Sequence, residues 1–310
     1  MQISWNRVAL TGAGLTLLTT TLVVRAGDLT PPAGPIAPTM KTIEDAEPRV
    51  IITAADLPLT ISSPGSFYLG DSIATAGAGI IIDSGDVTID LNGFSLTGGA
   101  GDGVSVAISA PPHRNITIRS GSVTGWSQDG VDAGNAIGCR AIDVQVTLNG
   151  AVGIQLGDLG SVENCIASEN GGVGILAGSA STITGCTAYR NTGDGIEAGS
   201  ACRLIANNCV ENGFNGDGAG IHITGSGNRL EDNNAVDNDR GIEFGFQGDF
   251  TAGNRNFLVR NSVTGAPGGV EGNYVFHPLG VQSTFGELLN FVGGGEINAG
   301  NSSPWANFEY

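Results

Sequence analysis

A glycine followed by isoleucine or valine recurs through most of this chain, and no other feature limits its fold as much. The pair recurs at intervals of 21 to 27 residues, as Gly79-Ile80, Gly103-Val104, Gly130-Val131, Gly153-Ile154, Gly174-Ile175, Gly195-Ile196, Gly220-Ile221 and Gly241-Ile242. A second small or apolar residue follows two positions after each Ile or Val, as in a strand whose alternate side chains point inward. Short strands at this nearly constant spacing, without helical periodicity, predict a parallel β-solenoid in which each coil stacks on the last.

Asparagines mark the turns of the repeat. Asn149, Asn170, Asn191 and Asn212 follow one another at equal intervals. Asn tolerates the left-handed turn conformation, and stacked amides can form hydrogen bonds from coil to coil. We therefore expect the asparagines to occupy left-handed turn positions and to form a ladder. Leucine-rich repeats have a similar period, but their Leu-x-x-Leu-x-Leu pattern is absent from this sequence.

The N-terminal segment, residues 1–26, has the features of a signal peptide. Arg7 precedes the apolar run Val8–Val24, and small residues allow cleavage after Ala26. A retained N-terminal anchor is the alternative, although the run lies at the short limit for crossing a bilayer. Cleavage would leave no membrane span and would place the protein in a secreted, periplasmic or cell-surface location.

Composition divides the remainder into three segments. Residues 27–49 form a Pro-rich linker followed by a short capping helix over 39–47, with Thr42 as its N-cap. Residues 50–270 form the repeat domain, and residues 271–310 form a C-terminal cap or tail. Caps are expected because both ends of a solenoid expose unpaired strand edges.

The charge of the chain limits its partners. The chain has 13 basic and 30 acidic residues, a net charge of −17, and Lys41 is its one lysine. Nucleic acid is a poor partner, because binding its backbone requires clustered Lys or Arg. A cation, or a neutral or metal-bridged ligand, fits this surface better.

Three motifs resemble a known family. The run Val87–Phe94, the recurring Asp-Gly-Ile/Val, and Pro304–Phe308 are similar to secreted bacterial right-handed parallel β-helix repeat proteins of the pectate-lyase-like superfamily. The resemblance covers about residues 50–270. It implies an all-β fold, a single-stranded right-handed parallel β-helix of about eight to nine coils. Right-handed connections between parallel strands are also the general preference in proteins. The superfamily includes polysaccharide lyases, hydrolases and epimerases, phage depolymerases and adhesins, so the resemblance implies a polysaccharide or cell-surface glycan as partner.

In polysaccharide-active members the ligand lies along one outer sheet, so the side chains between the two inward columns are candidate site residues. These outward residues are Ile81, Ser105, Asp132, Gln155, Leu176, Glu197, His222 and Glu243. Adjacent rungs would place His222 between Glu197 and Glu243. Glu197, His222, Glu243 and Arg240 are the candidate catalytic residues. In this hypothesis one of the two carboxylates acts as acid or base, His222 transfers a proton and Arg240 holds the sugar. The alternative is that a polar row on a soluble solenoid avoids like-charge repulsion and has no further role.

Other residues are candidates for ligand binding. They are Asp132, Gln155, Asp194 and Asp217, with Tyr189 and Trp126 as exposed aromatic residues that could stack on a sugar ring. Long coils place insertions near 107–115, 132–141 and 212–219, of which the last lies next to the His222 row. Two function classes stay open: an extracellular module whose acidic face binds glycan or another surface, and a polysaccharide lyase, hydrolase or epimerase acting along the outer groove. The sequence has no Gly-His-Gly or Asp-Pro-His motif of the enzymes and no lysine at the row to neutralise a uronate.

The repeat requires no cofactor, although calcium is possible. Asp102, Asp129, Asp132 and Asp194 lie in or beside Gly-rich turns, where carboxylate and carbonyl oxygens could converge. Tight Asp-Gly turns need no metal, which is the alternative. The five cysteines show no CxxC pairing, and we expect them to be mostly buried and reduced.

Overall fold

The computed structural model describes residues 48–214, 218–245 and 255–264, and the backbone of four strands further along the chain. The expected signal peptide, linker and capping helix lie in residues 1–47, outside the described residues. In the described part, the one helical element is a 3-10 turn, η1 (Ala54–Asp56). No helix there has the length and apolar character needed to span a membrane.

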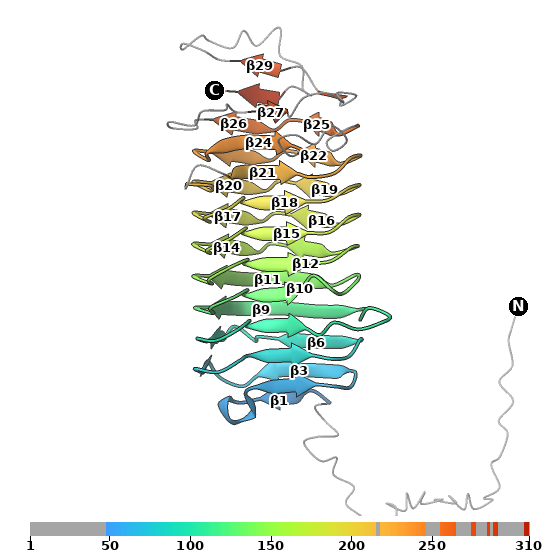
Figure 1. Cartoon of the computed structure of the whole chain (residues 1–310), viewed down its shortest axis with the longest axis vertical. Coiled ribbons are helices and arrows are strands. Elements are labelled where there is room, and N and C mark those ends of the chain that lie inside the picture. The colour runs from blue at the N-terminus through green and yellow to red at the C-terminus, as the bar shows by residue number, and fades with distance from the viewer. Residues whose placement is uncertain are drawn as a thin grey trace, which may run out of the picture. The chain divides into compact units, whose positions relative to one another are not determined.

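The repeat forms one parallel sheet with a single strand from each coil, stacked rung on rung (Figure 1). Its ten strands are β2 (Leu59–Ile61), β5 (Ile80–Ile82), β8 (Val104–Val106), β10 (Val131–Ala133), β12 (Ile154–Leu156), β15 (Ile175–Ala177), β18 (Ile196–Ala198), β21 (Ala219–Ile223), β24 (Arg240–Phe244) and β27 (Tyr274–Phe276). Eight of the ten contain the Ile or Val of a Gly-Ile/Val pair, and β2 and β27 extend the ladder beyond them. The predicted right-handed parallel β-helix is therefore confirmed.

The rest of each coil contributes to a second parallel sheet of twenty strands. These strands are β1 (Val50–Ile52), β3 (Gly65–Leu69), β4 (Ile73–Ala74), β6 (Val87–Asp90), β7 (Ser95–Thr97), β9 (Ile116–Thr124), β11 (Arg140–Thr147), β13 (Ser161–Glu163), β14 (Ile166–Ser168), β16 (Thr182–Thr184), β17 (Thr187–Tyr189), β19 (Arg203–Ile205), β20 (Asn208–Val210), β22 (Arg229–Glu231), β23 (Asn234–Val236), β25 (Phe257–Val259), β26 (Ser262–Thr264), β28 (Thr284–Phe285), β29 (Leu288–Asn290) and β30 (Asn307–Glu309). The last three lie in the segment expected to be a C-terminal cap, and their backbones continue this sheet.

A regular coil has three short strands and three corners. In the coil formed by β12, β13 and β14, the inward side chains Ile154, Leu156, Val162 and Ala167 are at most 1% exposed. The next coil repeats this pattern, with Ile154 opposite Ile175. The core is consequently one narrow apolar column, and each side chain in it packs against its equivalents above and below.

Buried amide ladders stabilise the corners. The ladder before the ten-stranded sheet contains Asn149, Asn170, Asn191, Asn212 and Asn238, each at most 2% exposed. The Nδ2 of each of the first four donates a hydrogen bond of 2.9–3.0 Å to the Oδ1 of the asparagine on the next coil. Two shorter ladders occupy the other corners: Asn207, Asn233 and Asn261, and Asn228 with Asn256. The predicted hydrogen-bonded ladder is confirmed.

The expected backbone conformation of these asparagines was wrong. The positive φ belongs to the residue before each ladder amide, at Leu148, Arg190, Glu211 and Asp237 for example, with φ between 52° and 58°. The left-handed residue makes the corner and directs its own side chain outward, so the following residue can direct its amide inward. Sequence spacing locates the corner but does not distinguish these two neighbours.

Cysteines occupy some of the same corner positions. Cys165 and Cys186 lie two coils and one coil before Asn207, in the same column, and the backbone N–H of Cys186 donates to Asn207 Oδ1 at 3.0 Å. Cys209 lies in an inward column opposite Ala188 and Ala235. All five cysteines are buried and free. They therefore serve as small buried residues in the core and corners.

Candidate functional site

The predicted outward row exists in the predicted register. On the ten-stranded sheet, Asp132 is opposite Gln155 and Leu176 is opposite Glu197. His222 lies between Glu197 on β18 and Glu243 on β24. Burial along the row is uneven, because Glu197 is partly exposed whereas His222 is 7% and Glu243 is 4% exposed. The end of the row that contains His222 is therefore largely closed to solvent.

His222 is held by two hydrogen-bond acceptors. Its Nδ1 lies 3.0 Å from Asp194 Oδ2, and its Nε2 lies 2.9 Å from the carbonyl oxygen of Gly245. Because a carboxylate and a carbonyl both accept, both ring nitrogens must donate, and the imidazole is protonated. Burial lowers its pKa, but the hydrogen bond and charge of Asp194, with the Gly245 carbonyl and the Glu243 charge, outweigh burial and raise the pKa to about 9.

Arg240 completes this cluster from the start of β24. Its Nη1 lies 3.2 Å from Glu243 Oε2, and both side chains are largely buried. Asp194 also accepts the backbone N–H of Ala219 at 2.5 Å, which fixes its carboxylate beside the imidazole. The cluster therefore contains two carboxylates, an imidazolium and a guanidinium held by one another, which differs from the Glu197–His222–Glu243 arrangement that spacing alone predicts.

The same cluster is the one group in the described residues whose atoms could converge on a metal. One ligand atom each from Asp194, His222 and Glu243 lies within 4.8 Å of the others. A metal ligand needs a free lone pair on the imidazole, and both nitrogens of His222 carry protons in this geometry. Glu243 faces Arg240 as well, so the donor set fits an ion-pair network better than a metal.

Glu197 differs from Glu243, the other carboxylate next to His222 in the row. It is partly exposed, and burial and the nearby charge of Asp194 raise its pKa, while His222 acts in the opposite direction. A carboxyl group with a raised pKa at a solvent-accessible position is a candidate proton donor. Of the two carboxyl groups that flank His222, Glu197 is therefore the better placed to meet a ligand.

A groove of about 500 Å³ runs along the other half of the row, over five successive coils. It is lined by Pro112, Gly134, Asn135, Ala136, Ile137, Gln155, Leu156, Gly157, Asp158, Leu176, Ala177, Gly178, Ser179, Gly199 and Thr224. Gln155 and Leu176 come from the outward row, whereas Gly199 and Thr224 belong to the coils of Glu197 and His222. The groove thus joins the exposed part of the row to the coils that contain the charged cluster.

Two of the three insertions line this groove. Pro112 comes from the insertion near 107–115, and Gly134–Ile137 come from the insertion near 132–141. Spacing predicts that the insertion near 212–219 is the one beside the site, and it does not identify Pro112 or Asn135 as lining residues. Coil length reveals where extra chain exists, but the direction in which it folds depends on tertiary packing.

The expectation that Trp126 is an exposed aromatic residue was wrong. Its side chain is 1% exposed, and its Nε1 donates to the carbonyl of Leu96 at 3.3 Å. Two glycines make room for it: a Cβ on Gly98 would lie 2.2 Å from the indole ring, and one on Gly103 would lie 2.9 Å from its Nε1. Trp126 is therefore a core residue that no ligand can reach in this fold.

The remaining predicted ligand contacts separate. Tyr189 is at the end of β17 in the twenty-stranded sheet, where Arg190 lies 5.1 Å from its ring centre. It is therefore not part of the outward row on the ten-stranded sheet. Asp217 lies outside the described residues.

The aspartates proposed for calcium have a structural use in their turns. Asp102 accepts the backbone N–H of Asp129 at 3.0 Å, and Asp129 accepts that of Val152 at 2.7 Å. Asp132 accepts the N–H of Gly134 at 3.0 Å. Burial raises the pKa of Asp102 and of Asp129, and the charge of Asp132 raises each further. Asp194 belongs to the His222 cluster instead, and calcium binding stays a prediction.

These features define the class of protein: a right-handed parallel β-helix with a groove and a charged cluster on one outer sheet. The chain belongs to the family described as right handed beta helix region, whose model matches residues 73–274. A search of curated proteins finds no match.

Two solved structures are similar in fold. The pectate lyase Pel9A has 13% identity and a TM-score of 0.45, with 74% of this chain and 72% of that chain covered. The A-module of the mannuronan C-5 epimerase AlgE6 of Azotobacter vinelandii has 14% identity and a TM-score of 0.47, with 76% and 86% covered.

Proposed function

We propose that this protein binds a neutral polysaccharide outside the cytoplasm, along the groove on its ten-stranded sheet. The observation that carries the proposal is the groove itself, which is continuous over five coils. At about 4.8 Å per rung, its length is roughly 19 Å. Its volume of about 500 Å³ is within the range of small-ligand sites, about 300–1,000 Å³. A narrow, elongated site of this kind suits an extended chain better than a compact molecule.

The lining chemistry supports an uncharged sugar. Asn135, Gln155, Ser179 and Thr224 supply amides and hydroxyls, which can exchange hydrogen bonds with sugar hydroxyls. Asp158 is the one charged residue in the lining, and its carboxylate already accepts the N–H of Ser179 at 2.8 Å. No Lys or Arg lines this groove, so it offers nothing to neutralise a polyuronate or a nucleic acid.

Binding is favoured over catalysis because the candidate catalytic groups are engaged with one another. Proton transfer needs a group within hydrogen-bond reach of the substrate. His222 is 7% exposed and gives both N–H groups to the protein, and Glu243 is 4% exposed beside Arg240. We therefore assign this cluster a structural role, in which it holds the end of the row in place.

Glu197 favours the second candidate, a polysaccharide lyase, hydrolase or epimerase. Its raised pKa and partial exposure suit a general acid beside the groove. The test is product formation: the chain is incubated with neutral and acidic polysaccharides, and reducing ends and unsaturated products are measured. Activity of the unmodified chain that is lost in Glu197→Gln would establish the enzyme. If no polysaccharide gives products, the binding function is the one that stands.

Calorimetry with oligosaccharides tests the binding proposal. We expect neutral oligosaccharides to bind more tightly than polyuronates of equal length. Gln155→Ala and Leu176→Ala should weaken binding, whereas Gln145→Ala should not. Gln145 is a matched control, because it is an exposed glutamine on β11 of the other sheet. Equal loss in Gln145→Ala, or tighter binding of polyuronates, would contradict the proposal.

A further inference from the structure

Four successive coils place a glycine directly after their strand of the ten-stranded sheet, and these glycines form the floor of the groove. They are Gly134, Gly157, Gly178 and Gly199. The register of the strands stacks them one above the other. Two of them have no room for a side chain: a Cβ on Gly157 would lie 2.1 Å from the carbonyl oxygen of Ala136, and one on Gly178 would lie 2.7 Å from the backbone nitrogen of Asp158. The floor is therefore free of side chains over these four coils.

The floor ends toward the C-terminal coils. On the coil of β21 the equivalent residue is Thr224, whose side chain lines the groove, and on the next coil it is Gly245, which is buried. His222 Nε2 lies 2.9 Å from the carbonyl oxygen of Gly245, so the imidazole reaches from the row to the residue that would extend the floor. The row is buried on the same coils, because His222 is 7% and Glu243 is 4% exposed. The site is consequently closed beyond β18 and the Glu197 side chain.

The row stays accessible in the opposite direction. Every outward side chain from Glu197 back to Ile81 on β5 is partly exposed. At about 4.8 Å per rung, this accessible part of the row is roughly 24 Å long. An extended chain bound along the sheet can therefore continue over the N-terminal coils, whereas at the other end it stops at Glu197.

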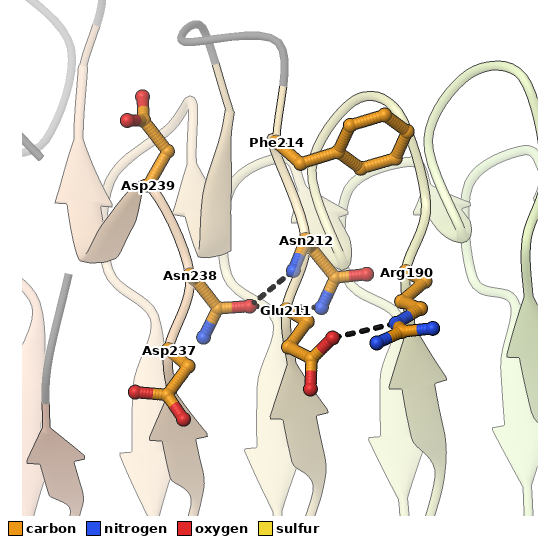
Figure 2. A pocket seen from close by; sticks show the side chains of 7 residues that line it. All are labelled: Arg190, Glu211, Asn212, Phe214, Asp237, Asn238 and Asp239. Atoms are coloured by element: carbon orange, nitrogen blue, oxygen red, sulfur yellow. Dashed lines mark hydrogen bonds and ion pairs between the residues drawn. The ribbon is translucent and has the colours of Figure 1, made fainter. Parts of the chain in front are cut away.

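A second cavity is separate from this closed end. It has a volume of about 480 Å³ and lies at the corner before the ten-stranded sheet, where the amides of Asn212 and Asn238 form a hydrogen bond (Figure 2). The glycine floor follows the strands, so the cavity and the groove lie at opposite ends of them. The two sites share no lining residue. The cavity is therefore not a continuation of the groove.

We infer that the groove recognises the end of a polysaccharide chain rather than its interior. The inference rests on the proposed function, because it concerns the ligand of the same groove. The terminal sugar unit lies over β18 beside Glu197, and the rest of the chain follows the row toward β5. A terminal unit has one hydroxyl group more than an interior unit, and the Glu197 carboxylate can accept a hydrogen bond from it. An interior unit at this place would continue into His222 and Glu243.

Binding stoichiometry tests the inference. Oligomers of β-1,4-linked glucose, mannose and xylose are prepared at two pure lengths, one just longer than the groove and one three times as long, and are titrated with the full chain by calorimetry. We expect one protein per oligomer at both lengths. Several proteins on the longer oligomer would overturn the inference and leave the proposed function intact. Absence of binding to all three sugars would overturn both.

A bulky label at either end of the longer oligomer identifies the end that is bound. One preparation carries the label at the reducing end, and the other carries it at the opposite end. We expect one label to abolish binding and the other to leave the affinity unchanged. Loss of binding with neither label, or with both, would overturn the inference.

Gly199→Ala and Gly65→Ala are a matched pair of variants. A Cβ on Gly199 first meets Ser179 Oγ at 3.0 Å, and one on Gly65 first meets the Phe67 ring at 3.1 Å. Gly65 lies on β3 of the other sheet. Gly199→Ala places a methyl group under the terminal sugar and should weaken binding of both oligomers by roughly tenfold, whereas Gly65→Ala should not change it.

Glu197→Gln keeps the shape of the side chain and provides a second variant if Gly199→Ala does not fold, which circular dichroism detects. Its loss of charge should weaken binding of both oligomers by roughly tenfold, because hydrogen bonds to a charged group are stronger than those to a neutral one. Unchanged affinity in Glu197→Gln, or equal losses in Gly199→Ala and Gly65→Ala, would overturn the placement of the chain end at β18.

Discussion

Replacing Asn191 by alanine removes one amide from the middle of the longest ladder. The Oδ1 of Asn191 accepts from the backbone N–H of Asn170 at 3.1 Å and from its Nδ2 at 2.9 Å. The Nδ2 of Asn191 donates to the carbonyl of Ala167 at 3.0 Å and to Asn212 Oδ1 at 2.9 Å. The side chain is fully buried, so water cannot replace these partners without opening the corner.

The expected loss follows from the donors that are left without an acceptor. A buried donor that loses its partner costs about 1–3 kcal/mol, and Asn191→Ala leaves two such donors on Asn170. The free energy of unfolding should fall by about 2–6 kcal/mol. Asn149 lies at the start of the ladder, and its Oδ1 accepts the backbone N–H of Trp126 at 3.1 Å. Asn149→Ala leaves that one donor, so it should cost less, about 1–3 kcal/mol.

Urea unfolding followed by circular dichroism measures both variants. Asn234→Ala is the matched control, because its Nδ2 donates to Asn208 Oδ1 at 2.8 Å in an exposed pair rather than a buried one. We expect this control to change stability by no more than about 0.5 kcal/mol. If Asn191→Ala costs no more than Asn234→Ala, the buried ladder does not stabilise the corner and the reasoning is refuted.

The remaining predictions concern charge, backbone conformation and packing. First, the raised pKa of His222 contributes stability that is complete below pH 6.5 and is lost as pH rises through about 9. The loss, about 3 kcal/mol in the free energy of unfolding, is measured by urea unfolding at a series of pH values, and Asp194→Asn should abolish it. An unchanged pH profile in this variant would contradict the assignment of Asp194 as the partner of the His222 imidazolium. Second, Ala180 has φ of 57°, a left-handed conformation that is strained for alanine but not for glycine. Ala180→Gly should therefore raise the free energy of unfolding by about 0.5–1 kcal/mol, and a lower free energy of unfolding would show that the corner is not strained. Third, Gly98→Ala should destabilise by about 1–3 kcal/mol and change the near-UV signal of Trp126, because the new methyl group overlaps the indole; an unchanged spectrum would contradict that packing.

Strand register was the most predictable part of this structure. A buried strand has a period of two, and the coil length then fixes which residues are opposite one another. The sequence alone therefore places Glu197, His222 and Glu243 on adjacent rungs, as the structure confirms. Inward columns such as Ala167, Ala188 and Cys209 follow from the same spacing.

Side-chain partners at the site were less predictable. Spacing suggests that His222 interacts with its neighbours along the row. Instead, its imidazole donates to Asp194, in the turn before β18 on the previous coil, and to the carbonyl of Gly245. These contacts depend on the path of the backbone through the turns, which no repeat period specifies. Trp126 illustrates the same limit, because its burial depends on Gly98 and Gly103, which come earlier in the chain and lie against its indole only in the folded solenoid.

The amide ladders also give the solenoid an electrical direction. In all three ladders each bond between two asparagines runs from the Nδ2 of one to the Oδ1 of the asparagine on the next coil toward the C-terminus. The side-chain dipoles therefore align with the positive end toward the C-terminus, and aligned dipoles polarise one another and add, as they do in a helix. Adding or removing a coil would change this axial dipole at every corner that carries an amide, without changing the net charge of the protein.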